Sequence, residues 1–584
     1  MNEKDLLKEA MENFNNALAI ESENREDALI SSRFADGDQW PEEIRIQRMN
    51  ENRPCLTINK LRKFISNISG EIQQNRPSVE VRPVNGGANV AGAILRNDII
   101  KYIEDNSKSY IAYDTAVQQA LEGGYGYYRI ITSYSDNNSF NQDILIKAIP
   151  NRFSVVLDQQ AEGKVYEDAR FGFVMNKINK SDFKKTYKNA EMVSFDAPDG
   201  NYDWLDDDQI RIAEYFWKEK IEEKIYLLDD GNILDTKTFN LLKDSNNIES
   251  IANRITRERT IYKDIVKWAK LTQNAIFEGP LVFPGSYIPI IPVIGYEYND
   301  EGRRRFRSLI HDAIDPMRMF NYWKTYATEM IALSPKAPYK ITPQQIEGNE
   351  DQWNVANISP QPYLLYNHIQ GIPLPSREPP VPIPAAAVNE ANMSAQDIQD
   401  VIGMYAPSIG EPSNERSGRA ILARQRQSNN TIFTFINNFQ SSLIHTGKIL
   451  LEMIPEIYDT ERVLQIVGKE GMKELKINFP TVNLDEMIEY MENDLTYGKY
   501  DMIPTVGPNF QTKRMQTAAS MLDFLQFVPM SAPIIAPKLA TLMDWEGAQT
   551  IGEEMSSLLQ SQMQPKPPVG SNAVPTDTEI LQQQ

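Results

Sequence analysis

The stretch DPMRMFNYWKTYATEMIAL, residues 315–333, decides the fold of this chain. Its large apolar residues recur every three or four positions, which places them on one stripe of an α-helix. The same spacing extends back to Phe306, so the pattern predicts a helix over residues 303–333. Asp315 is a favourable N-cap and Pro316 a favourable first helical residue. Two alternatives follow: the helix kinks at this point, or it begins there.

Four arginines come just before this stretch, at Arg303, Arg304, Arg305 and Arg307. The N-terminal end of a helix carries the positive end of its dipole and disfavours cations. The cluster therefore favours the later helix start, or it needs acidic partners outside the helix. Salt bridges to neighbouring domains or subunits are the simpler interpretation of this cluster.

A second helical pattern covers about residues 389–405 and, after a break, 417–458. The break reads APSIGEPSN, residues 406–414, and its prolines and glycine exclude a continuous helix. Further basic side chains follow it, at Arg416, Arg419, Arg424 and Arg426. For these, salt bridging and a functional role are evenly matched. Two long helices with little core of their own favour packing against other copies of the chain.

Composition excludes several classes of protein. The chain has 584 residues and a net charge of −20, which argues against a general polyanion-binding protein. Its single cysteine, Cys55, excludes an intramolecular disulfide framework and suits a reducing cytoplasm. The N-terminus has no apolar signal core, and the most apolar run, residues 287–296, is too short to span a bilayer. We expect a soluble, intracellular protein without membrane contact.

Helical and strand-like patterns alternate through the rest of the chain, which predicts an α+β fold. One α+β domain is expected over residues 1–302, and residues 459–510 are expected to add to it. Helices are predicted at 1–50, 58–74, 90–104 and 112–122, with a further polar helical interval at 236–258. Strands are predicted at 79–84, 125–134, 143–149, 153–157, 171–175 and 260–295, with hairpins at 211–228 and 463–478.

Between the two helical patterns, residues 334–385 are rich in proline and aromatic residues. A disordered linker is one interpretation, but the aromatic residues and a strand-like centre favour a small ordered lobe. Near the C-terminus, helices are predicted at 515–527 and 535–559, and residues 561–584 have the composition of a disordered tail.

The sequence contains no recognisable phosphate-binding, zinc-binding or calcium-binding motif. Gly447-Lys448 lacks the upstream glycine and the following hydroxyl of a phosphate-binding loop. Three dispersed histidines, at positions 311, 368 and 445, and one cysteine make a zinc site improbable. The acidic cluster at 203–208 lacks the alternating ligands and central glycine of a calcium loop. We therefore predict no catalytic residue, no metal site, no cofactor and no enzyme activity.

At this point the chain resembles the portal (head–tail connector) proteins of tailed double-stranded-DNA bacteriophages, especially those of short-tailed podoviruses. Both the order of the predicted segments and several local stretches carry the resemblance. These stretches include INKLRKFISNISGEIQQNRPSVEVRP (58–83), LEGGYGYYRIITSY (121–134), IPIIPVIGYEY (288–298), DPMRMFNYWKTYATEMIA (315–332), SGRAILARQRQ (417–427) and VGPNFQTKRMQ (506–516).

The resemblance implies a dodecameric ring at one vertex of the capsid. In the terms of that family, the wing is 1–302 with 459–510, the stem 303–333 with 386–405, and the clip 334–385. The tunnel loop is 406–416, the long helix 417–458, and the helical crown 511–560, with a short tail at 561–584 in place of a long barrel.

The resemblance also implies the partners. Double-stranded DNA passes through the channel during packaging and ejection, the terminase motor docks first, and tail adaptor or head-completion proteins dock later. Capsid and scaffolding proteins surround the ring, in the virion and, during assembly, in the host cytoplasm. By analogy with the family, Arg416 and Arg419 would face the channel. The arginines at 303, 304, 305, 307, 424 and 426 would line the channel or join subunits.

Two alternatives stay open at the level of sequence. The first is an enzyme of the packaging pathway, a motor or a nuclease, although the missing phosphate loop weighs against a motor. The second is a structural tail or scaffold protein that forms no channel.

Overall fold

The structure is a computed structural model, and the described residues form two units, Met1–Pro504 and Thr505–Gln584. Helices and strands are mixed in it, which confirms the predicted α+β class. The structure describes residues 2–74, 76–84, 88–136, 138–187, 194–195, 208–229, 233–236, 239, 254–333, 338–379, 385–404, 418–468, 471–483, 488–496, 498–504, 518, 520–522, 524–542, 551–552 and 554–558.

The first unit begins with helices, as predicted. The first of these, α1, has 34 residues and ends at Gly37, whose φ of 116° suits glycine. The Asn89 side chain caps α4 by accepting a hydrogen bond from the backbone N–H of Gly92. The bounds are α1 Glu3–Asp36, α2 Glu42–Asn50, α3 Leu61–Gln74, α4 Val90–Ser107 and α5 Ser109–Gly123.

An antiparallel sheet follows, with the strand order β4-β5-β6-β8-β9 and β7 paired to β6. The bounds are β4 Val155–Leu157, β5 Phe171–Asn179, β6 Gln209–Leu228, β7 Ile233–Asp235, β8 Ile255–Leu271 and β9 Ile276–Phe283. The 3-10 turn η1, Arg152–Ser154, comes before β4, and the helix α6, Lys180–Thr186, comes after β5.

One prediction in this sheet is wrong, and a second is wrong in part. The predicted hairpin over 211–228 is one strand, β6, which pairs with β8 along its length. The polar residues Lys218–Lys220 suggested a turn, but they mark the point where the strand changes from buried to exposed. The predicted helical interval at 236–258 agrees with the structure at Thr236 and Phe239, which are helical, and is wrong at its end, where β8 begins at Ile255. Residues 240–253 within it lie outside the described residues.

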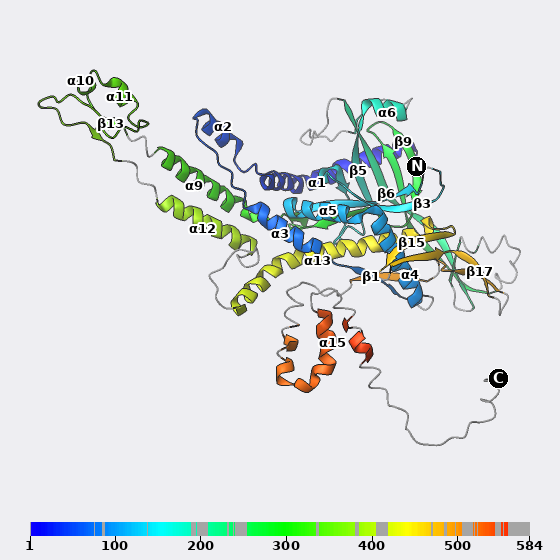
Figure 1. Ribbon diagram of the computed structural model, residues 1–584. Coiled ribbons are helices and arrows are strands. Elements are labelled where there is room, and N and C mark those ends of the chain that lie inside the picture. Colours follow the sequence, from blue (N-terminus) through cyan, green and yellow to red (C-terminus); the bar gives the residue numbers. More distant parts are fainter. Residues whose placement is uncertain are drawn as a thin grey trace. The chain divides into compact units, whose positions relative to one another are not determined.

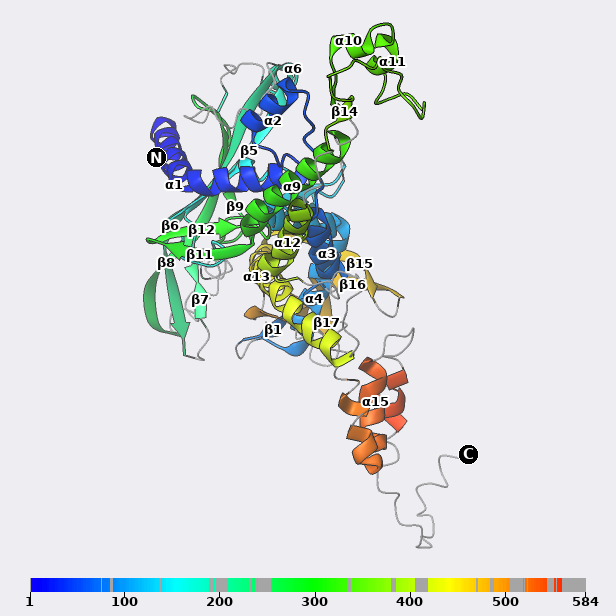
Figure 2. The ribbon, with the colours of Figure 1, turned by 90° about the vertical axis from the view of Figure 1, so that its left-hand side faces the viewer.

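Helix α1 lies against one face of this sheet (Figures 1 and 2). The ring centroid of Phe14 lies 5.4 Å from that of Phe173 and 4.7 Å from that of Phe195. Tyr215 stacks on Phe173 with the centroids 4.5 Å apart. Because fully burying one such side chain stabilises by about 1.5–3 kcal/mol, this aromatic layer fixes α1 on the sheet.

A second, three-stranded sheet has the order β10-β2-β3, with β10 Ile290–Ile294, β2 Tyr125–Tyr134 and β3 Gln142–Ala148. All five residues of β10 are buried. Helix α5 packs against β2, and a Cβ atom at Gly126 would lie 2.3 Å from the Ala116 carbonyl oxygen. Gly126, which the sequence presents only as part of a GGYGY run, is therefore a close-packing position.

The predicted helix from Arg303 is wrong in its first part. Residues Arg303–Arg307 form the strand β12, which pairs with β11, Tyr296–Asp300. After the short 3-10 helix η2, His311–Ala313, the helix α9 runs from Ile314 to Leu333. The structure supports the alternative in which the helix starts later. Phe306 continued the helical spacing by chance, because it is the buried residue of a strand.

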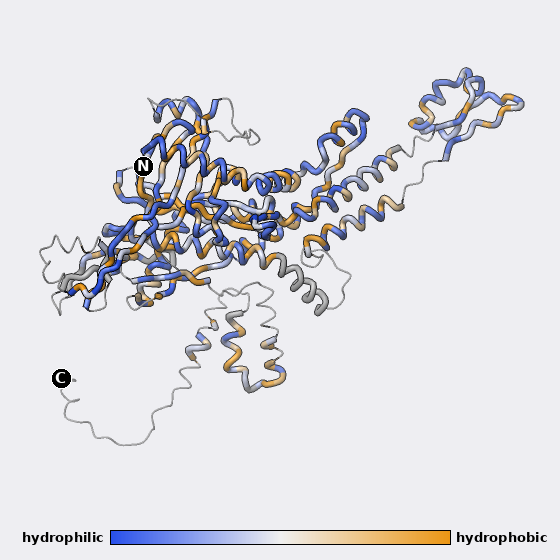
Figure 3. Tube along the Cα trace, turned by 180° about the vertical axis from the view of Figure 1, so that it is seen from behind, coloured by the Kyte–Doolittle hydropathy of each residue, from blue (hydrophilic) through white to orange (hydrophobic). Residues whose placement is uncertain are grey.

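An ordered lobe follows α9 in the chain. Its described residues 338–379 contain β13 Tyr339–Lys340, α10 Pro343–Ile346, α11 Glu350–Asn354 and β14 Ser376–Arg377. Next come α12, Ala385–Ile402, and α13, Gly418–Ile457. Helix α12 packs along α9 (Figures 1 and 3). The ordered-lobe prediction is confirmed for these residues, and the disordered-linker alternative does not hold for them.

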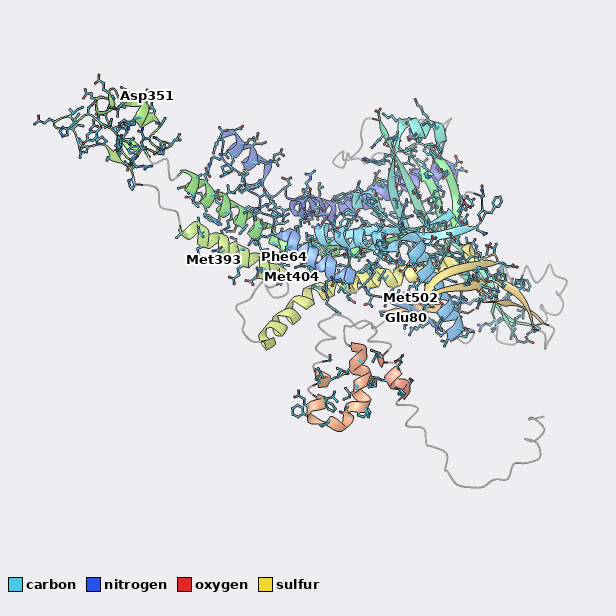
Figure 4. All side chains as sticks on the ribbon, viewed as in Figure 1. Phe64, Glu80, Asp351, Met393, Met404 and Met502 are labelled. Atoms are coloured by element: carbon cyan, nitrogen blue, oxygen red, sulfur yellow. The ribbon has the colours of Figure 1, made fainter. Side chains whose placement is uncertain are left out.

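The first unit ends in hairpins. The predicted hairpin is confirmed as β15, Arg462–Gly468, with β16, Gly471–Ile477. A second hairpin, β17 Phe479–Asn483 with β18 Ile488–Glu492, was not predicted. The last strand, β19 Tyr500–Pro504, pairs with β1, Val79–Pro83, so Met502 in Figure 4 lies opposite Val81.

The second unit is helical where it is described. It contains the 3-10 turn η5, Pro529–Ser531, and the helix α15, Ala532–Leu542. Helical residues also occur within 520–527 and 551–558. The predicted tail at 561–584 lies outside the described residues.

Candidate functional site

The first arginine cluster lies on a hairpin and is held by its own chain. At the turn, Glu301 and Gly302 have φ values of 50° and 80°, as a tight two-residue hairpin turn requires. Arg304 pairs with Glu297 at 2.6 Å and donates to the backbone carbonyls of Gly163 and Lys164. Its guanidinium also stacks on the Tyr166 ring, 4.6 Å from the centroid. Arg304 is therefore a structural clamp between β12 and the loop before β5.

The neighbouring arginines also find acidic partners in the chain. Arg305 pairs with Glu23 of α1, and Arg307 lies 3.6 Å from Asp312. Arg303 is exposed at the end of the hairpin. Salt bridging is thus what the structure shows for three members of the cluster, with partners in the same chain.

The second arginine group is only partly described. Arg416 and the whole segment 406–416 lie outside the described residues. Arg419, Arg424 and Arg426 lie on α13, but the structure describes their backbone only. Their predicted contacts with DNA or with other subunits stay predictions.

Helix α13 is anchored to the three-stranded sheet by polar side chains at every fourth position. Asn438 donates to the Gly295 carbonyl at 2.6 Å, and Ser442 donates to the Pro292 carbonyl at 2.6 Å. The hydroxyls of Thr446 and Tyr128 lie 2.7 Å apart. These buried hydrogen bonds fix the C-terminal half of the helix that follows the 406–416 segment.

Further along this face, Gly447 has a packing role. A Cβ atom there would lie 2.4 Å from the Met502 Cε atom. Gly447 is thus a position where α13 passes closely over β19. This agrees with the interpretation that Gly447-Lys448 is not a phosphate-binding loop.

A segment that we call the arm, residues 37–60, lies against α9. The predicted helix over 1–50 includes its helix α2, but neither the break after Asp36 nor the contacts with α9 were predicted. Asn321 donates to the Gln39 side chain at 2.6 Å and accepts from the backbone N–H of Ile58 at 2.9 Å. Glu329 accepts from Arg48 at 3.0 Å and from Arg53 at 2.7 Å. These contacts hold the arm, which includes α2, along α9 (Figure 1).

The lobe is held by local hydrogen bonds while several apolar side chains stay exposed. Thr342 and Gln345 form a capping box at α10, and the Trp353 Nε1 atom donates to the Leu365 carbonyl at 2.7 Å. Its exposed apolar side chains are Ile358, Tyr363, Leu365, Tyr366 and Leu374.

Two buried polar groups belong to the packing. Glu21 and Arg25 form a fully buried pair on α1, and Arg25 also donates to the carbonyls of Phe153 and Val155. Burial raises the pKa of Glu21, and Arg25 opposes that rise. Burial lowers the pKa of His445 to about 3, and its Nδ1 atom has no hydrogen-bond partner among the described residues.

A metal centre finds no support in the part of the chain that the structure describes. Its His, Cys, Asp and Glu residues include no group of three or more that could hold an ion. Across the described helices, no segment combines the length and apolar character needed to cross a membrane.

The comparison with known families decides the identity. The family model of the phage P22-like portal proteins matches residues 11–584 of this chain. The chain belongs to the P22-like phage portal protein family. The portal protein of Acyrthosiphon pisum secondary endosymbiont phage 1 is 25% identical over 544 residues, which cover 88% of this chain and 75% of the relative.

This family is structural, so the prediction of a non-enzyme is confirmed, and so is the resemblance drawn from the sequence. Sequence reasoning did not predict how the arm is placed on α9. Its signal was weak: three large apolar residues, Ile44, Ile46 and Met49, stand within a strongly charged stretch and follow no helical stripe.

Proposed function

We propose that the chain assembles as a dodecameric ring at one capsid vertex and forms the channel for packaging and ejection of double-stranded DNA. The observation that carries this proposal is the pair of packed helices α9 and α12 with the lobe inserted between them in a chain of this family. The net charge of −20 supports it, because a conduit for DNA should repel phosphate broadly and contact it at few places.

We assign the stem to α9 and α12, the clip to residues 334–385, and the wing to the sheets of the first unit. The crown would be formed by residues 511–560. In this arrangement the terminase motor docks on the clip during packaging, and tail adaptor or head-completion proteins replace it afterwards. The exposed apolar side chains of the lobe support this docking role. Capsid and scaffolding proteins would contact the wing.

The segment 406–416 would be the tunnel loop, with Arg416 and Arg419 forming a narrow basic ring. Contacts from such a ring to phosphate are individually weak and depend on salt, so they would steady DNA without stopping it.

The experiment replaces both arginines by alanine in a phage complementation assay. Normal ring assembly with impaired DNA packaging or retention is the expected result, and Arg33→Ala, an exposed arginine on α1, is the matched control. Loss of the ring would show that these arginines join subunits. Normal packaging would remove them from the mechanism.

Docking is tested separately by deleting residues 340–380. The wing should stay folded, judged by circular dichroism, while binding to the terminase motor in a pull-down is lost. Unchanged binding would place the docking site elsewhere in the chain.

A further inference from the structure

The short helix α2 turns its apolar side chains outward. Ile44, Ile46 and Met49 are exposed, and 76% of the Met49 surface is accessible. Its buried residue is Arg48, which pairs with Glu329 of α9. The charged residues Glu42, Glu43 and Arg45 are exposed as well, so the helix contacts its own chain through Arg48 and turns no apolar side to the core. A surface helix ordinarily buries its apolar side, so the three exposed apolar residues mark α2 as a surface that a neighbouring copy could cover.

Next to α2, the arm and α9 enclose an apolar groove of about 260 Å³. On α9, 49% of the Met319 surface and 48% of the Tyr322 surface are accessible. Arg318 lies at the groove and is the basic side chain in its lining. The main apolar lining residues are Trp40, Pro41, Ile44, Met319, Tyr322 and Trp323.

The helix paired with α9 exposes apolar and acidic side chains together on one side. At 100° per residue, all charged residues of α12, namely Glu390, Asp397 and Asp400, fall in one sector of about 100° together with Met393 and Val401. We call this sector the α12 flank. Of the Met393 surface 51% is accessible, and of the Val401 surface 47% (Figure 4 labels Met393).

The groove and the α12 flank belong to different sides of the helix pair. On α9, the buried residues Met317, Phe320 and Ala327 lie roughly 140–160° around the helix from Tyr322. Helix α12 packs along α9 and buries its own stripe of Ala387, Ala391 and Ile398. The groove of one copy therefore stays accessible while α12 is in place.

We propose that the groove of one copy receives the α12 flank of a second copy. Met393 and Val401 would cover Met319 and Tyr322, and the acidic residues of the flank would face Arg318. A contact between two different surfaces of identical chains repeats until it closes, and this produces a ring. The inference deepens the proposed function, because it names the surfaces through which the stem would join neighbouring copies.

Charge selects a second copy as the occupant. Helix α12 contains three acidic residues and no basic residue, whereas the groove carries Arg318. Arg318 also pairs with the exposed Asp315 of its own helix at 3.4 Å, so the flank would share this guanidinium with Asp315. The apolar parts of the two surfaces would exclude water, and the charges at the edge would set their orientation. A different protein in the groove is the competing outcome that the experiment must separate.

The experiment mixes two single-cysteine variants of the full chain, both in a Cys55→Ser background. One population carries Met319→Cys and the other Met393→Cys, so a mixed disulfide joins two copies only. Mild oxidation of the mixture should give a disulfide-linked dimer on a non-reducing gel, and neither population alone should give it.

The matched control replaces Met393→Cys by Val388→Cys, an exposed position on the opposite side of α12. It should give no cross-link with Met319→Cys. If rings form but the two pairs cross-link equally, or neither does, the inference is wrong while the proposed ring stands. If the unmodified chain forms no ring at all, the proposed function fails first.

Discussion

Helices α13 and α9 show two ways of holding a long helix. The described side chains of α13, from Ile432 onward, are mostly buried against sheets and donate hydrogen bonds to backbone carbonyls. Helix α9 buries one stripe against α12 and holds the arm on another, but leaves Met319 and Tyr322 half exposed. The described part of α13 therefore finds its partners within one chain, whereas the helix pair leaves apolar surface that the proposed assembly would cover.

The largest loss of stability is expected at the buried Glu21–Arg25 pair of α1, whose partners all lie within one chain. Arg25→Leu leaves the buried Glu21 carboxylate without its partner. Breaking a buried ion pair from one side costs about 3–5 kcal/mol, so the free energy of unfolding should fall by that amount. Urea denaturation followed by circular dichroism measures it. Arg33→Ala, at an exposed position of the same helix, is the control, and equal losses in the two variants would contradict the assignment.

A smaller loss is expected at the anchor of α13. Asn438→Ala removes the donor to the Gly295 carbonyl and leaves a buried acceptor unpaired, which costs about 1–3 kcal/mol. Hydrogen exchange should accelerate in α13 and β10. The exposed neighbour Asn437→Ala should leave exchange unchanged, and a matching acceleration there would mean that the hydrogen bond does not anchor the helix.

His445, on the same buried face of α13, should make the stability of the chain depend on pH. Burial lowers the pKa of His445 to about 3 from its ordinary value of 6.5, so between these pH values the unfolded chain holds a proton that the folded chain lacks. The free energy of unfolding therefore keeps its full value above pH 6.5. Below pH 6.5, His445 lowers it by about 1.4 kcal/mol for each pH unit.

His445→Phe should flatten this slope in urea titrations between pH 7 and pH 5, while His368→Gln, an exposed histidine of the lobe, should keep it. A slope that stays the same in the His445 variant would show that other groups cause the loss of stability in acid.

The smallest effect on the single chain is expected at the exposed side of the helix pair. Tyr322→Ser should change the unfolding free energy of dissociated subunits by less than about 0.5 kcal/mol, as for most surface substitutions. The same variant should raise the concentration at which assemblies dissociate, measured by light scattering. A large loss of subunit stability would mean that Tyr322 belongs to the core of its own chain.

How far the sequence predicts this molecule depends on where side chains find their partners. Helical spacing located α9, α12 and α13 because each has a continuous apolar stripe. It failed at Arg303–Arg307, where Phe306 alone is buried and the arginines find partners in α1, β11 and η2. The sequence pattern was also misleading at β6. The residues of this strand become polar where it leaves the core, although the chain does not turn there.

The position of the arm on α9 was missed for a related reason. This position depends on hydrogen bonds with α9, in which Gln39 accepts from Asn321 and the backbone N–H groups of Leu56 and Ile58 donate. These are contacts between segments more than 250 residues apart. Such contacts leave no periodic pattern in the sequence. The candidate channel residues at 406–416 were identified from the resemblance alone and stay predictions.

The decisive experiment on the proposed ring is native mass spectrometry of the intact chain. We expect a closed dodecamer, because the exposed sides of α9 and α12 would be covered by neighbouring copies. A well-folded monomer that stays monomeric at high concentration would contradict the proposed portal ring and, with it, the role of these faces.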